Sequence, residues 1–303
     1  MNLHLYDAHN HLHDERFGGR QAELLAACVR EGVASMVVNG SCEADWPQVL
    51  ALTRSYTVLG RERGSTGPQK SVPLASNDAK DSATTAGCKP GLRIIPSFGY
   101  HPWYVHKRTP DWQANLIRFL EQAPSAIGEI GLDRWKPELS YEGQEEVFIA
   151  QLRLAAERNL PASIHCLQAW GRMLEILKSE PRPACGFLLH SYGGPKEMVR
   201  AFADLGAYFS LPGYYAHERK QRQRETFKQV PRDRLLIETD APDQCLPDSH
   251  NRFPLRDAAG ERAINHPANL GAVYAFAAEF LEQPVETLAA QVEENFWRLF
   301  GGL

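Results

Sequence analysis

Two histidines that lie two residues apart, His9 and His11, follow the first apolar run of this chain, Leu3–Asp7. In an extended segment such residues point to the same side, so both can bind one metal ion. Further histidines and carboxylates follow later apolar runs, where strands would end; they are Glu129, His165, His190 and Asp240. Divalent metals accept such mixed nitrogen and oxygen ligands, and two ions a few ångströms apart can activate one water molecule. The pattern therefore predicts a binuclear hydrolytic centre.

The types of these residues suggest how they would share two ions. Glu129 can bridge both ions through its two oxygens, and His165 and His190 can hold the second ion. Asp240 can bind the first ion and accept a proton from a bound water. Each residue alone also has a structural reading, because a histidine after an apolar run is often a core residue and Asp240 could be a helix N-cap. Their recurrence at the ends of five of eight expected strands favours the metal centre.

Short apolar runs alternate with longer amphipathic segments from end to end. The strands and helices that this pattern predicts must position the candidate metal ligands. We expect eight strands at Leu3–Asp7, Ser35–Asn39, Ile94–Tyr100, Ala126–Gly131, Ala162–His165, Gly186–His190, Ala207–Ser210 and Leu235–Thr239. Helical spacing recurs between them, for example at Arg20–Glu31, Tyr141–Asn159 and Pro195–Leu205. Eight strands that are each followed by a helix predict an α/β fold, a single (β/α)8 TIM-like barrel whose strand ends converge on one mouth. A helix at Pro284–Phe300 is expected to close it.

The barrel is expected to form one domain over residues 1–303, with two long polar segments. Gly60–Gly91 is rich in small, polar and charged residues and predicts a surface-loop insertion, with a short element around Val72–Ala75. Ala241–Ile264 follows the eighth strand, where barrel loops shape the substrate mouth.

Composition excludes several classes of protein. The 303 residues carry 33 basic and 37 acidic side chains, a net charge of −4, and 43% are hydrophobic, which is typical of a globular protein rather than a disordered one. No apolar run approaches a membrane span, no signal peptide is visible and six cysteines form no CxxC pair, so we expect a cytoplasmic protein without a membrane or an obligate protein partner. The chain lacks GxGxxG, GxxxxGK[ST] and GxSxG, which argues against nucleotide-binding folds and serine hydrolases.

Several motifs in fixed order resemble those of the TatD family of metal-dependent hydrolases, which belong to the amidohydrolase-like barrels. They are DAHNH at Asp7–His11, GYHPW at Gly99–Trp103, GEIGLD at Gly128–Asp133, IH at Ile164–His165, LHSYGG at Leu189–Gly194, ETDAP at Glu238–Pro242, NHP at Asn265–Pro267 and ENFWRLFG at Glu294–Gly301. The resemblance implies two divalent ions, and a deoxyribonuclease activity (a DNase, often 3′→5′ exonucleolytic) for this chain.

By position, the resemblance assigns each candidate residue a role. His9 and His11 match ligands of one metal, Glu129 the shared ligand, and Asp240 the ligand that doubles as a base. The histidines that match ligands of the second metal are His165 and His190, and His101 matches a histidine near the scissile phosphate. Such a histidine-rich set suits Zn, Mn or Fe, while Mg could support turnover at the more weakly held site.

Departures from the family pattern keep a second substrate class open. His13 stands where the family commonly has Asp, Leu167 stands where it usually has Arg, and both long polar segments exceed the typical length. The expected substrate is a DNA phosphodiester; the alternative is a small amide, lactone or ester in a narrower mouth. A barrel that keeps the metal ligands but serves only as a scaffold is the third reading.

Basic and aromatic residues near the expected strand ends bear on the choice of substrate. His106–Arg108 and the basic run Arg219–Lys228 could steer a phosphate backbone or could form solvated faces. Aromatic side chains that could stack on a base, or pack at the rim, are Trp103, Tyr104, Tyr214 and Tyr215.

Overall fold

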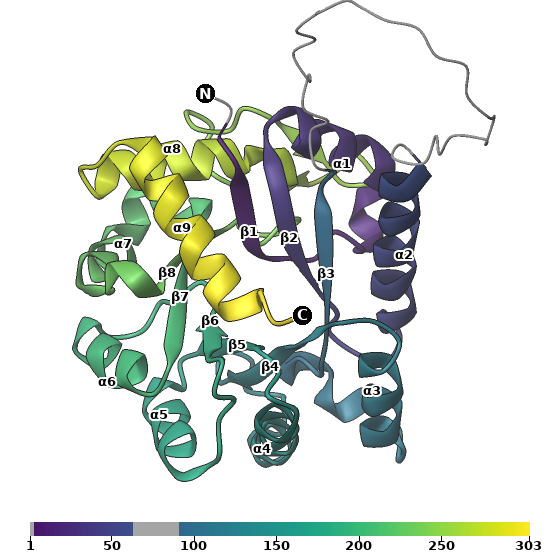
Figure 1. The fold of residues 1–303 in the computed structure, drawn as a ribbon. Helices are drawn as coiled ribbons and strands as arrows, with labels where there is room; N and C mark the ends of the chain where they lie inside the picture. The colour runs from purple at the N-terminus through teal and green to yellow at the C-terminus, as the bar shows by residue number, and fades with distance from the viewer. Residues whose placement is uncertain (1–2, 63–90) are drawn as a thin grey trace, which may run out of the picture.

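The computed structural model describes residues 3–62 and 91–303, and its architecture is a barrel of eight parallel strands. The strands pair in sequence order, β1 with β2 through to β7 with β8, as Figure 1 shows together with the surrounding helices. They are β1 Leu5–Asn10, β2 Val33–Asn39, β3 Arg93–Phe98, β4 Ala126–Asp133, β5 Ala162–Leu167, β6 Phe187–Leu189, β7 Ala207–Pro212 and β8 Leu235–Glu238. The expected (β/α)8 fold is confirmed.

Helices follow the strands and cover the outside of the barrel (Figure 1). Their apolar faces pack on strands whose residues are almost all buried, so the hydrophobic core is continuous from barrel to helices. The helices are α1 Gln21–Arg30, α2 Trp46–Glu62, α3 Trp112–Leu120, α4 Tyr141–Arg158, α5 Trp170–Ser179, α6 Val199–Asp204, α7 Gln221–Thr226, α8 Leu270–Phe280 and α9 Val285–Phe300. None of these described helices has the length and apolar character that a bilayer crossing requires.

The barrel nearly closes where the end of β8 meets β1. The backbone N–H of Asp240 donates to the His9 carbonyl at 3.0 Å, and that of His11 donates to the Ala241 carbonyl at 2.7 Å. These bonds fix three candidate ligands, His9, His11 and Asp240, on adjacent chain segments although they are separated by more than two hundred residues of sequence.

The C-terminal helix α9 lies across the opposite end of the barrel, as expected (Figure 1). The amide of Asn295 donates to the carbonyls of Arg232 and Leu235, at 2.7 and 2.8 Å, which ties α9 to the chain that enters β8. Tyr6 of β1 donates to Glu293 at 2.7 Å and packs on Phe296. Residues at the amino ends of the strands therefore stabilise the fold, and the carboxyl ends of the strands are free to carry functional side chains.

Most expected boundaries differ from the observed ones by one or two residues, and three of the differences affect how the chain is described. β1 runs to Asn10, so His9 lies within the strand, and β4 continues to Asp133, so Glu129 lies in the middle of β4 rather than at its end. Both strands are buried along their whole length, so no alternation of polar and apolar residues marks where they stop. The helix expected at Pro195–Leu205 begins with a 3-10 turn, Lys196–Met198, before α6.

The two long polar segments have different outcomes. Residues 60–62 belong to α2 and not to a loop, whereas residues 63–90, including the element expected at Val72–Ala75, lie outside the described residues. The segment after β8 is described throughout and contains a short antiparallel hairpin, β9 Leu255–Arg256 and β10 Ala263–Ile264. Its first residues, including Asp243 and Gln244, line the mouth as expected.

Candidate metal centre

A pocket of about 380 Å³ opens at the carboxyl ends of the barrel strands. Its walls include six of the seven candidate residues together with Asp14, Arg16, Trp103, Tyr214 and Lys220; one of the six is Asp240, and the others are His11, His101, Glu129, His165 and His190. Buried His9 lies directly beside it. The fold therefore brings all seven sequence-predicted residues to one place.

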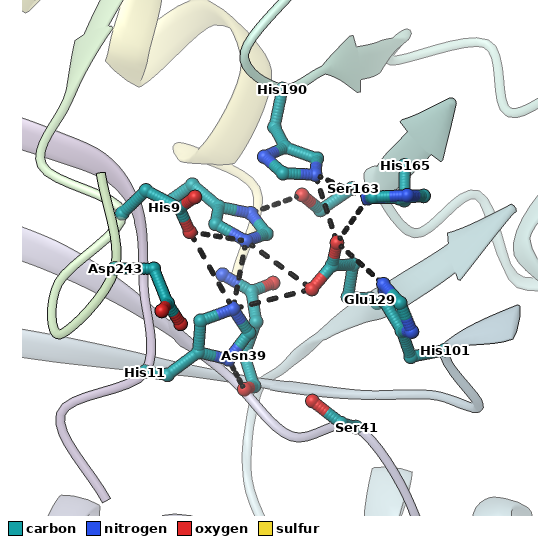
Figure 2. Close-up of polar contacts among 12 residues, drawn as sticks. His9, His11, Asn39, Ser41, His101, Glu129, Ser163, His165, His190 and Asp243 are labelled. Atoms are coloured by element: carbon teal, nitrogen blue, oxygen red, sulfur yellow. Dashed lines mark hydrogen bonds and ion pairs between the residues drawn. The ribbon is translucent and has the colours of Figure 1, made fainter. Parts of the chain in front are cut away.

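The carboxylate of Glu129 is the centre of this arrangement (Figure 2). Its Oε1 lies 2.8 Å from His190 Nε2, 3.0 Å from His165 Nδ1 and 3.3 Å from His101 Nε2. Its Oε2 lies on the other side, 3.2 Å from His11 Nε2 and 3.6 Å from His9 Nε2. One carboxylate thus presents each of its oxygens to a separate set of imidazoles, which is the geometry that a bridging ligand requires.

Asp240 completes the set on the side of β1. Its Oδ1 lies 3.7 Å from His9 Nε2 and 3.6 Å from His11 Nε2, and these two nitrogens are 3.3 Å apart. Its Oδ2 accepts from Gln244 Nε2 at 2.5 Å. Gln244 therefore orients the carboxylate so that one oxygen faces the histidine pair.

Hydrogen bonds at the far side of each ring fix which imidazole nitrogen carries the proton. His11 Nδ1 lies 2.7 Å from the Asn39 carbonyl, which only accepts, so in the neutral ring Nδ1 holds the proton and Nε2 has the lone pair. His165 Nε2 lies 3.0 Å from the Asp133 carboxylate, so in the neutral ring the lone pair is on Nδ1, which faces Glu129. In the neutral form both rings therefore suit metal binding, because the partner of the opposite nitrogen sets the tautomer.

His101 has the opposite arrangement. Its Nδ1 accepts the backbone N–H of Trp103 at 3.1 Å, so in the neutral ring Nε2 carries the proton and points at Glu129 as a donor. This ring is prepared to donate a hydrogen bond and not to bind a metal.

His9 and His190 are buried and stack on each other with ring centroids 4.0 Å apart. His9 Nδ1 lies 2.8 Å from Ser163 Oγ (Figure 2). His190 Nδ1 has no hydrogen-bond partner within the described chain and lies 3.9 Å from the buried carboxyl of Glu238, which accepts from the hydroxyls of Ser191 and Ser210. The stack therefore brings His9 of β1 into contact with His190, which follows β6.

The pKa values of the acidic groups follow from burial and from these contacts. Burial disfavours the charge of Glu129, but His101 and His190 outweigh it and hold the pKa of that carboxyl well below its usual value. Burial dominates at Asp240 and raises its pKa to about 7, although His190 and His11 oppose the shift. Glu129 is therefore an anion at any working pH, while Asp240 exchanges its proton near neutrality.

The imidazoles divide into two groups. Burial alone would lower the pKa of His11, but Glu129 and Asp240 outweigh it and raise that pKa to about 10. Burial is likewise overcome at His165, where Asp133 and Glu129 raise the pKa to about 9. Burial lowers the pKa of His101 to about 4 and that of His9 well below its usual value. Without metal, the positive charges on His11 and His165 balance the carboxylates of Glu129 and Asp133.

The donor set fits divalent metal ions. Three overlapping groups have their ligand atoms within 4.8 Å of one another, namely His9–His11–Glu129, His9–His190–Asp240 and His101–Glu129–His165. Nitrogen and carboxylate donors of this kind suit Zn, Mn or Fe. The third group contains His101, but its Nε2 carries the proton in the neutral ring, so His101 does not offer a lone pair to a metal from that nitrogen.

Several residues that organise the centre were not among the sequence candidates. Asp133, Ser163 and Glu238 are buried and bind or face the rings of His165, His9 and His190. Asp133 and Glu238 lie inside the GEIGLD and ETDAP motifs, and this position next to ligands was the signal that could have identified them.

His13 and Leu167, which differ from the residues common in the TatD family, both line the pocket. The side chain of His13 is 7% exposed and its Nε2 lies 3.6 Å from Asp45, while Leu167 is 37% exposed. Arg16 in the same wall is paired with both Asp14 and Asp243. Lys220, which lies over the ring of Tyr214, has no carboxylate partner in the described chain. The residues of the basic run Arg219–Lys228 therefore differ in role. Lys220 faces the pocket, whereas Arg224 donates to the carbonyls of Tyr215 and Ala216 and supports the fold.

Comparison with known proteins identifies the family and the fold. A family model described as TatD related DNase matches residues 6–301. The 3'-5' ssDNA/RNA exonuclease TatD of Klebsiella pneumoniae (strain 342) is 37% identical over 260 residues, which span 85% of this chain and 92% of that protein. The uncharacterized metal-dependent hydrolase YjjV of Escherichia coli (strain K12) is 25% identical over 297 residues, 97% of this chain and 96% of that one. The crystal structure of E. coli YjjV, a TatD homolog, matches with a TM-score of 0.79 at 24% identity and covers 99% of both chains.

Proposed function

This chain belongs to the TatD family of metal-dependent hydrolases, and we propose that it is a deoxyribonuclease that cleaves DNA phosphodiesters, with removal of nucleotides from the 3′ end. The observation that carries the proposal is the position of Glu129, whose two oxygens face two separate imidazole sets. A relative that is 37% identical is named as an exonuclease on single-stranded DNA and RNA, which supports the choice of substrate. The eight-stranded barrel of the described residues would form one catalytic domain.

In this proposal the centre holds two ions, Zn, Mn, Fe or Mg. His9, His11 and Asp240 would hold one ion, His165 and His190 the other, and Glu129 would bridge them. When bound, such ions polarise a phosphodiester and favour ionisation of a water molecule.

The side chains of the chain itself supply orientation and proton transfer. Asp240 Oδ1 faces the site while Gln244 holds Oδ2, so this oriented carboxylate can take a proton from water and return it. His101 stays neutral because burial lowers its pKa, so its Nε2–H can donate to a phosphate oxygen beside Glu129.

One experiment tests the function directly. End-labelled single-stranded DNA is incubated with the protein and Mg, Mn or Zn, and the Asp240→Asn variant serves as the control. Metal-dependent release of nucleotides that this variant abolishes supports the proposal, and the label shows the polarity. Absence of release from a protein that holds two metals per chain would refute it. The same protein would then be assayed on small amides, lactones and esters, because the exposed apolar Leu167 suits such a substrate.

A further inference from the structure

Two tryptophans form the wall of the mouth beside His165. Trp103 follows β3, is half-buried and lines the pocket, with its ring centroid 6.5 Å from that of His165. Trp135 follows β4 and is 56% exposed, which is more than any other large apolar side chain in the described part of the chain. An exposed tryptophan that continues the wall of a catalytic pocket is a candidate binding surface.

Both tryptophans are held by a single buried carboxylate. Asp133 Oδ2 accepts from Trp103 Nε1 at 2.7 Å, and Asp133 Oδ1 accepts from the backbone N–H of Trp135 at 2.6 Å. The two ring centroids lie 6.3 Å apart with the planes tilted by 35°. The same Asp133 Oδ2 lies 3.0 Å from His165 Nε2, so the aromatic wall and the candidate metal ligand share one anchor. The Trp103 ring and the backbone of Trp135 are therefore held at a defined position relative to the centre.

The wall also carries positive charge. Lys136 Nζ lies 3.6 Å from the ring centroid of Trp103, and no carboxylate within the described residues pairs with it. Arg134 lies over the ring of Tyr141, 3.7 Å from its centroid, on the same turn. A flat aromatic surface next to an unpaired cation suits a ligand with a flat face and a negative charge.

We propose that Trp135, supported by Trp103, stacks an unpaired base of a single-stranded nucleic acid and that Lys136 binds a phosphate of the same strand. This inference rests on the proposed function and specifies which side of the centre the strand occupies. A base within a duplex has both faces covered by its neighbours, whereas a base in a single strand can place a face on Trp135. The wall therefore selects single strands over duplexes, and it does so without reading sequence.

Fluorescence of the full-length, metal-loaded protein measures this binding directly. The probe is a short oligothymidylate with phosphorothioate linkages, which resist hydrolysis. Stacking on Trp135 is expected to quench the emission, and Trp135→Ala is expected to remove most of this quenching and weaken binding by roughly tenfold or more. Trp297→Phe is the matched control, because Trp297 lies on α9 at the opposite end of the barrel. A duplex of the same length is expected to quench little.

Salt dependence separately tests the cation. Lys136→Ala is expected to lower the slope of log affinity against log salt by about one, the effect of one lost phosphate contact. Lys178→Ala, in the last turn of α5, is the control and is expected to leave the slope unchanged. Unchanged affinity in both Trp135→Ala and Lys136→Ala would overturn the inference. So would a loss of binding confined to Tyr214→Ala and Lys220→Ala, which would place the strand on the opposite wall.

The failure of this inference can be told apart from failure of the proposed function. Wild-type protein is assayed with bis(p-nitrophenyl) phosphate, which has no base to stack. If the protein cleaves this diester and DNA but binds the oligonucleotide independently of Trp135, only the proposed base stacking on Trp135 is rejected. Absence of all phosphodiester cleavage would reject the proposed function, and with it the inference.

Discussion

The carboxylate of Asp133 lies 3.0 Å from His165 Nε2, and the opposite nitrogen of that ring lies 3.0 Å from Glu129 Oε1. His165 therefore stands between two carboxylates, one that fixes its proton and one that shares its proposed ion. Such outer partners of a metal-binding histidine set its tautomer and its orientation. The strength of the proposed centre is thus expected to depend on residues that never touch an ion.

Removal of the Asp133 charge is expected to weaken metal binding. In Asp133→Asn the amide no longer demands a proton on His165 Nε2, so the lone pair of Nδ1 is less firmly directed at the site. We expect affinity for one of the two ions to fall by roughly 10–100-fold. Metal titration with a competing chelator measures this, and Asp111→Asn, on the exposed start of α3, is the control. Equal affinities in wild type and Asp133→Asn would contradict the role given to Asp133.

His101 and His165 are expected to differ although both lie near Glu129. His101→Ala should keep the full metal content but lower kcat by about a hundredfold, because it loses a hydrogen-bond donor and not a ligand. His165→Ala should lose bound metal. Elemental analysis of both purified variants, with kcat measured alongside, separates the roles. Metal loss in His101→Ala would make His101 a ligand instead.

Metal loading is expected to release protons near neutral pH. The pKa values of His11 and His165 in the metal-free protein are raised to about 10 and about 9, above the usual 6.5, so both rings hold a proton that an ion must displace. Apparent metal affinity should therefore rise with pH up to about 9–10 and then level off. Calorimetric titration with metal in two buffers of different ionisation heat counts the protons, and equal heats in both buffers would contradict the prediction.

The same shifts predict the stability of the metal-free protein. The raised pKa values stabilise the folded state fully below pH 6.5, and this contribution is lost as pH rises through about 9–10. The midpoint of thermal unfolding should therefore fall over that interval in chelator. With saturating metal, which keeps both rings neutral, the fall should be smaller.

Gly131 is expected to be essential for the approach of β4 to β5. A Cβ at this position would lie 1.9 Å from the carbonyl oxygen of His165, and its φ of +139° is unfavourable for other residues. Gly131→Ala should therefore destabilise the protein by at least about 2 kcal/mol and disturb His165. Gly171→Ala is the control, since a Cβ in this exposed position of α5 meets nothing within 4 Å and should stabilise by about 0.5–1 kcal/mol. Denaturant unfolding measures both changes.

The sequence by itself determined the barrel and the chemical character of its mouth. Alternation of buried strands and amphipathic helices is a local pattern, so eight strands and the closing helix α9 could be read from it. The candidate ligands were also recognisable, because an imidazole or a carboxylate next to a buried strand is unusual wherever the partner lies. The limits of β1 and β4 could not be read, since both strands are buried on every side.

Only the tertiary structure decided which ring nitrogen of each histidine carries the proton and which faces the centre. His11, His101 and His165 are the same residue type in similar positions, yet the far ring nitrogen faces a carbonyl, a backbone N–H and a carboxylate, respectively. In the neutral form these partners direct a lone pair at the site in His11 and His165 and an N–H in His101. The aromatic wall at Trp135 depends on Asp133 in the same way. These partners come from different strands, and the direction of a lone pair depends on the atom that faces the opposite side of the ring, which no local pattern of the chain records.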